Sequence, residues 1–171
     1  MLMAIFGILW WLSGSMAMDI AARGAAAVAG VALGAILCWL AARQISGHRS
    51  HDVYARAANR FRMTNVIQAG AIVAVIVIGN ATGERGWIPG LIAVVVGLHF
   101  LPLAGPFERP EYRWVGGFMA LLGVSGCGLA FAGAPAARVL SVVGMGCAVV
   151  LWASVVWLLS AARSQRRDQL G

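Results

Sequence analysis

The chain has 171 residues, of which 61% are hydrophobic and only 11% are charged. Soluble domains are roughly half apolar and about a quarter charged, so this composition excludes a soluble globule and a disordered chain and predicts an integral membrane protein. The net charge of +7 comes from thirteen arginines that lie almost entirely between apolar segments, which is typical of membrane topology, so we expect no nucleic-acid partner.

Six apolar segments are long enough to cross a bilayer as helices, which takes roughly 20 residues. The links between the first and second, third and fourth, and fifth and sixth segments are so short that each pair must be antiparallel neighbours. The sequence therefore predicts an all-α transmembrane bundle of six helices arranged as three antiparallel hairpins, in a single membrane domain over residues 1–171. The expected spans are residues 2–18, 24–42, 63–82, 87–104, 114–132 and 136–160.

The first segment has small residues resembling a signal-peptide cleavage site at Ser15 to Ala17. It lacks the positively charged start of a signal peptide, because no charge occurs before Asp19. We therefore expect a retained helix. Trp10 and Trp11 lie near its middle, where we expect them to pack between helices, or the helix to lie shallower in the membrane.

Residues 44–62 form the largest expected soluble element. Val53, Ala57 and Phe61 recur every four residues, which predicts a short amphipathic helix. Its basic side would bind the anionic head groups of the inner leaflet, and a role in binding another protein is the alternative. The arginines of this interfacial loop are Arg49, Arg56, Arg60 and Arg62.

The arginines also predict the orientation. With six spans, one side of the membrane carries ten arginines and the other side three. Because loops rich in arginine stay in the cytoplasm, both termini are expected there, in the inner (plasma) membrane of a cell.

The fourth segment contains the one histidine of any span, His99. Ionisable residues inside membranes usually face the bundle interior or a water-filled cavity. Pro102 predicts a kink and a free acceptor, because it removes the backbone donor that would bind the carbonyl of Leu98. Counting about 1.5 Å per residue from the helix ends brings three other polar side chains to a similar depth. These candidate members of a polar layer with His99 are Asn65, Gln68 and Ser154.

The segment around His99 also carries a resemblance. Its sequence is G-L-H-F-L-P-L-A, followed by a loop with Phe107, Pro110 and Tyr112 and a glycine that opens the next span. This stretch, from Val96 to about Gly117, resembles small uncharacterised bacterial multi-pass membrane proteins. The resemblance implies a bacterial membrane family and no particular activity.

Several chemistries are disfavoured, so we expect no cofactor and no enzyme activity. The chain has no lysine, which excludes a Schiff base to retinal or pyridoxal phosphate and a Walker A loop. One membrane histidine is too few for bis-histidine haem, and His48 and His51 lack further ligands for a metal. A remote alternative is an intramembrane serine hydrolase using Ser125, whose G-V-S-G context matches rhomboid proteases only weakly.

The 22 glycines predict close helix packing, because helices in lipid associate where small residues let their backbones approach. A homodimer through the second span is an alternative use of such a surface. The glycines that we expect at helix contacts are Gly30, Gly34, Gly123 and Gly126.

The sequence thus predicts a multi-pass membrane protein of unassigned, non-enzymatic activity. The alternative is a small permease or channel that uses the polar layer around His99 and Gln68. All six acidic residues lie outside the expected spans, which deprives ion-coupled transport of its usual carboxylates.

Overall fold

The computed structural model describes residues 2–44, 49–105 and 111–168, and it describes side chains for residues 2–43, 61–105 and 111–164. This part of the chain is helical throughout, apart from short connections. It contains six α-helices and two short 3₁₀ turns. They are α1 (Leu2–Ser15), α2 (Ile20–Gln44), α3 (Arg49–Ala81), η1 (Arg85–Trp87), α4 (Ile88–Phe100), η2 (Leu101–Leu103), α5 (Glu111–Phe131) and α6 (Ala136–Asp168).

Local capping chemistry sets two of the helix boundaries. Asp19 caps α2, because its side chain accepts a hydrogen bond from the amide of Ala22 at 3.0 Å. At the end of α5, Gly133 has a φ of 77° and the amide of Ala134 donates to the carbonyl of Leu129 at 3.0 Å. This is a Schellman motif, which needs a residue with positive φ after the helix, and Pro135 then precedes α6.

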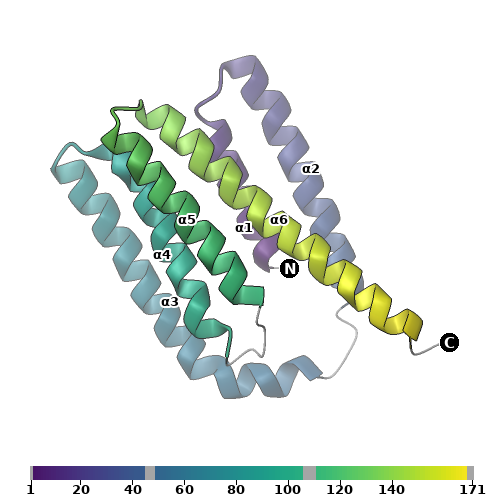
Figure 1. Ribbon diagram of the computed structural model, residues 1–171. Helices are drawn as coiled ribbons and strands as arrows, with labels where there is room; N and C mark the ends of the chain where they lie inside the picture. The colour runs from purple at the N-terminus through teal and green to yellow at the C-terminus, as the bar shows by residue number, and fades with distance from the viewer. Residues whose placement is uncertain (1, 45–48, 106–110, 169–171) are drawn as a thin grey trace.

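The helices form a bundle in which α4, α5, α6 and α1 are central and α3 and α2 lie at opposite edges (Figure 1). Going across the bundle, neighbours follow the order α3, α4, α5, α6, α1, α2. The most extensive contacts join α4 to α5 and α1 to α6. The N-terminal pair of helices therefore lies beside the last helix of the chain.

Five helical segments are long and apolar enough to cross a membrane: residues 20–43, 61–81, 85–103, 111–131 and 136–164. These correspond to the second to sixth predicted spans. The first predicted span, residues 2–18, is longer than the helix found there, because α1 has 14 residues and ends at Ser15. Such a helix is about 21 Å long, less than the roughly 30 Å of a bilayer core.

The helical segment predicted within residues 44–62 is the start of α3. Residues 49–60 are helical and continue without a break into the apolar part of α3. In Figure 1 these first turns lie at an angle to the rest of the helix. Arg62 is exposed, whereas the side chains of Arg49, Arg56 and Arg60 lie outside the described part of the chain.

Glycines bring α4 and α5 into backbone contact at two levels. A Cβ atom added to Gly97 would lie 2.6 Å from the carbonyl oxygen of Gly116 and 2.5 Å from the amide nitrogen of Ala120. One level further, a Cβ on Gly123 would lie 2.6 Å from the carbonyl oxygen of Gly90. The glycines in each helix are seven residues apart, which places them on one face. The two helices can pack this closely only because glycine has no side chain.

A second close contact joins α1 to α6. The backbones meet at Gly14 and Gly144, where an added Cβ would come within 2.8 Å of the other helix. About two turns away on the same face of α1, the indole of Trp152 occupies the space beside Gly7 and donates to the carbonyl of Ala4 at 3.3 Å. Trp152 is only 5% exposed.

We predicted that Trp10 and Trp11 pack between helices, and the structure shows this for Trp11. Its ring lies 5.3 Å from the ring of Trp152, and its indole donates to the carbonyl of Ala26 in α2 at 2.7 Å. Gly30 leaves room for this ring, and Gly34 leaves room for Ile8. Gly30 and Gly34 of α2 therefore pack against α1 within one chain.

Over residues 63–78, the polarity of α3 is inverted relative to a helix of a soluble protein. Its exposed side carries large apolar residues, whereas its half-buried side includes the polar residues Thr64, Asn65 and Gln68. Soluble helices bury the apolar stripe and expose the polar one. The exposed apolar side chains of α3 are Met63, Val66, Ile67, Val73, Ile76, Val77 and Ile78.

Candidate functional site

The candidate site lies where the end of α4 meets α3. His99 is half-buried in the last turn of α4, and its ring approaches the backbone of Thr64 in α3. The ring also meets Phe100 edge-on, with centroids 5.8 Å apart, and Phe100 meets Tyr112 of α5 at 5.7 Å. The histidine is thus held between α3 and an aromatic contact that leads to α5.

One nitrogen of this ring has no partner. Within the part of the chain whose side chains are described, only His99 Nδ1 and Arg23 Nε are buried side-chain polar atoms without a hydrogen bond. Leaving such an atom unsatisfied costs about 1–3 kcal/mol, so it requires an explanation. A buried, unpaired imidazole nitrogen can accept a proton or bind a small polar molecule.

Asn65 and Gln68, two of the residues predicted for the polar layer, lie on one half-buried side of α3. Thr64 and Gln68 are one helical turn apart, and Asn65 lies between them on the same half-buried side of α3. The residue of α3 that the His99 ring approaches is Thr64, one turn from the predicted neighbour Gln68. The sequence did not predict Thr64 because its backbone makes the contact with His99. Patterns of side chains in a sequence do not report backbone contacts.

Ser154 has its own partners in another part of the bundle. Its hydroxyl donates to the carbonyl of Leu151 at 2.6 Å and contacts the sulfur of Met3 in α1 at 3.3 Å. Depth counting placed Ser154 level with His99 but could not show which way it faces. Its contact with Met3 joins α6 to α1, whereas His99 contacts α3.

The free carbonyl predicted beside Pro102 is not found. α4 ends at Phe100, and Pro102 lies in the 3₁₀ turn η2. The carbonyl of Leu98 accepts a hydrogen bond from the amide of Leu101. This expectation was wrong because it assumed a continuous α-helix, whereas tightening to a 3₁₀ turn gives the carbonyl a donor three residues on.

Ser125 does not form a serine–histidine pair. It lies on the exposed side of α5, and its hydroxyl donates to the carbonyl of Leu121 at 2.9 Å. The Nδ1 atom of His99 has no hydrogen-bond partner. Within the part of the chain whose side chains are described, Ser125 and His99 therefore do not form the nucleophile–base pair that a serine hydrolase requires.

Of the glycines expected at helix contacts, Gly123 approaches α4, and Gly126 approaches Val143 of α6.

The three cysteines, Cys38, Cys127 and Cys147, are free thiols.

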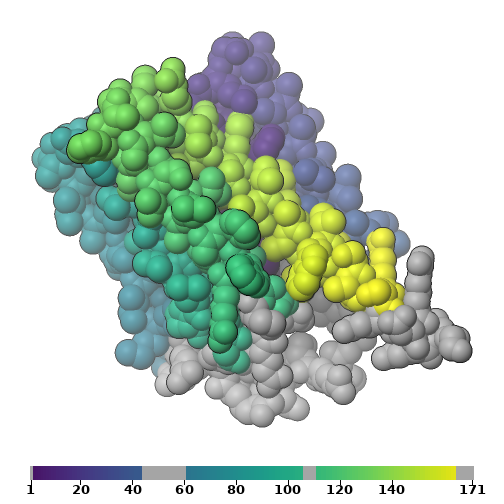
Figure 2. Space-filling view, viewed as in Figure 1, coloured from purple at the N-terminus to yellow at the C-terminus, as the bar shows by residue number. Residues whose placement is uncertain are grey.

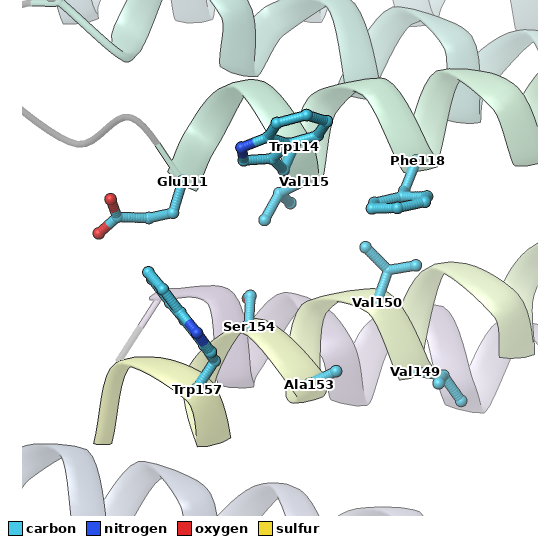
Figure 3. Close-up of a pocket in the computed structure, with 9 residues that line it drawn as sticks. All are labelled: Glu111, Trp114, Val115, Phe118, Val149, Val150, Ala153, Ser154 and Trp157. Atoms are coloured by element: carbon cyan, nitrogen blue, oxygen red, sulfur yellow. The ribbon is translucent and has the colours of Figure 1, made fainter. Parts of the chain in front are cut away.

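A groove between α5 and α6 was not predicted. It has a volume of about 400 Å³ and is lined by four residues of α5 and five of α6 (Figure 3). No sequence pattern distinguishes these residues from others that face lipid or the core. They are Glu111, Trp114, Val115, Phe118, Val149, Val150, Ala153, Ser154 and Trp157.

Comparison with known proteins identifies no relative of this fold and site. No family model, curated protein or solved structure was found to match the chain.

Proposed function

We propose that the chain is a multi-pass integral membrane protein of the bacterial inner membrane, without enzymatic activity, whose helices cross the bilayer as antiparallel neighbours and whose termini are cytoplasmic. The observation that carries this proposal is the inverted polarity of α3. Exposing Val66, Ile67 and Val77 to water would be costly, whereas lipid is as apolar as these side chains. The half-buried position of Gln68 turns its amide away from hydrocarbon, where it would lack partners.

Aromatic and basic residues support the orientation. Trp39, Trp114 and Trp157 are more than half exposed near the end of the bundle where α2 finishes and α5 begins. Arg43 stacks on Trp39 at this end, with its guanidinium 3.6 Å from the ring centroid. Tryptophan is typical of both membrane interfaces, and arginine near the helix ends favours the cytoplasmic one.

The proposal predicts two measurable results. The full chain should remain in the membrane fraction after extraction at alkaline pH. A reporter active only outside the cytoplasm should be inactive when fused to Gly171 and active when inserted after Gly133, in the connection between α5 and α6. Release of the chain by alkaline extraction would refute membrane insertion, and an active C-terminal fusion would refute the orientation alone.

A second candidate function is the passage of protons or small polar molecules beside His99. The specific observation in its favour is the buried and unpaired Nδ1 of His99, next to the half-buried polar side of α3. Because histidine titrates near neutrality, it can relay a proton without the carboxylate that other transporters use.

His99→Gln tests this candidate, because glutamine keeps a polar side chain but cannot titrate. In vesicles containing a pH-sensitive dye, wild-type protein should raise proton flux above that of empty vesicles, and His99→Gln should return it to the empty-vesicle level. Ser125→Ala is the control, since the serine hydroxyl is bonded within its own helix and should leave flux unchanged. Equal flux in wild-type and empty vesicles would reject proton passage.

A further inference from the structure

α3 is the apolar helix that the rest of the bundle covers least. None of the residues in its apolar stretch is buried, whereas between 22% and 44% are buried in the other four spans. Among the described elements, α3 contacts only α4 and the turns η1 and η2. It forms one outer edge of the molecule in the space-filling view (Figure 2). Most of the surface of α3 is therefore free to meet another helix in the membrane.

One flank of α3 has the residue spacing of a helix–helix contact. Asn65 lies about 100° round the helix from Thr64, the residue that His99 approaches, so it lies beside the α4-facing side and not at its centre. Ala69, Ile72 and Ile76 follow it at intervals of four, three and four residues, as the contact positions of a coiled coil do. Ala69 and Ile76 are exposed, and Asn65 and Ile72 are half-buried. We call these four residues the Asn65 flank.

The side-chain amide of Asn65 has no hydrogen bond within the part of the chain whose side chains are described. By contrast, Asn80 near the other end of α3 donates to the carbonyl of Ile76 at 2.8 Å. Asn65 lies about 6 Å inside the end of the apolar stretch that begins at residue 61. At that depth lipid supplies no hydrogen-bond partner, and an unsatisfied polar group is costly. A partner for the amide must therefore reach it within the membrane.

A second copy of the chain supplies that partner at the right depth. An amide has both a donor and an acceptor, so two identical amides can pair reciprocally. A closed dimer of identical chains has a twofold axis, which in a membrane runs along the bilayer normal because both copies have the same orientation. Asn65 then lies at the same depth in both copies. An asparagine at one contact position also fixes the register of two parallel helices.

We propose that two copies of the chain associate through the Asn65 flank of α3, with the two Asn65 amides bonded to each other across the twofold axis. The proposal rests on the membrane location proposed above. The exposed Ala69, one turn further on, lets the two backbones approach closely. The glycines of α2 do not offer an equivalent surface, because Trp11 fills the space beside Gly30 and Ile8 fills the space beside Gly34.

The test is the mass of the purified full chain in mild detergent, measured by native mass spectrometry over a range of protein concentrations. The wild type should show a two-chain mass, twice 17.9 kDa. Asn65→Leu should raise the dissociation constant of the dimer about tenfold, since interhelical amide bonds in membranes contribute modestly. Asn65→Gln keeps an amide and should restore much of the association. Gln68→Leu is the matched control, because it removes a half-buried amide that lies nearer the α4-facing side, and it should leave the dissociation constant unchanged.

A second pair of variants blocks the flank by size. Ala69→Trp should abolish the dimer, because the indole would stand between the two backbones. Ala74→Trp, at another exposed alanine of α3 about 140° further round the helix, should dimerise as the wild type does. These variants decide the matter if Asn65→Leu does not fold.

A single-chain mass for the wild type at all concentrations would overturn the proposal. So would a dimer that Asn65→Leu and Ala69→Trp leave unchanged, since the two copies would then meet elsewhere. Membrane location is measured separately by alkaline extraction, so a chain that stays in the membrane but is monomeric rejects the dimer alone.

Discussion

Gly116→Ala is expected to destabilise the fold, whereas Gly117→Ala, one residue further on, is expected to be neutral or slightly stabilising. A Cβ atom on Gly116 would lie 2.5 Å from the carbonyl oxygen of Gly97, which cannot move without shifting α4. Nothing lies within 4 Å of a Cβ on Gly117. Overpacking typically costs about 1–3 kcal/mol. Replacing an unhindered helical glycine by alanine instead gains up to about 1 kcal/mol in soluble helices.

Each variant adds one methyl group, and the two positions lie in the same turn of α5. Effects of detergent, expression and lipid are therefore matched. Their thermal midpoints in detergent should fall on opposite sides of the wild-type value, or Gly117→Ala should equal it. By the scaling for soluble domains of this size, each kcal/mol corresponds to about 2–4 °C. Equal midpoints for both variants would contradict the close contact of α4 and α5.

Trp152→Ala is expected to have the largest effect of any single truncation in the core. The indole is 5% exposed, meets the ring of Trp11 at 5.3 Å and donates to the carbonyl of Ala4. Removing it leaves a cavity between α1 and α6 and takes away that hydrogen bond. Phenylalanine or tryptophan truncations in protein cores cost about 3–5 kcal/mol. Trp157→Ala, five residues further along α6, removes an exposed ring and should cost far less.

A double-mutant cycle makes this prediction specific to the fit of Trp152 against Gly7. Gly7→Ala should destabilise the wild-type chain, because its methyl group would overlap the indole of Trp152. In a Trp152→Leu background the same substitution should cost much less, so the two changes should not be additive. Additive free energies of unfolding, measured by denaturant titration in detergent, would show that the two residues do not touch.

The positions of the helices could be predicted from the sequence because hydrophobicity along the chain reports them directly. Five segments with their turn residues agree with the structure, and capping by Asp19 and Gly133 follows ordinary local rules. The extent of α1 could not be predicted as well. Met16 and Ala17 are as compatible with a span as the residues before them, yet the helix ends at Ser15.

The neighbours of each helix were harder to predict than the helices themselves. Short links indicate sequential neighbours, but they say nothing of the contact between α1 and α6, whose residues are more than 100 positions apart. That contact depends on how Gly14 fits Gly144 and how Trp152 fits Gly7. Glycine and tryptophan are frequent in this chain, so their identity alone does not pair them.

The candidate site shows the same limit. Residue counting along the helices predicted that His99 lies level with Gln68, whereas the α3 residue that its ring approaches is Thr64, one turn earlier. The rotation of a helix about its axis is set by packing, and it separates His99, which contacts α3, from Ser154, which contacts α1. The groove depends on the divergence of two helices, and no residue pattern encodes that divergence.

The contact between α1 and α6 also orders the events of biosynthesis. A ribosome completes α1 and α2 long before it reaches Trp152, since more than 100 residues separate them. At about 5–20 residues per second, the first two helices wait roughly 5–20 s for their permanent neighbour. During this interval the face of α1 with Gly7 and Gly14 has no partner from α6. The first hairpin therefore acquires its final position only after α6 has been made, and a nascent chain that stops after α5 leaves that face bare.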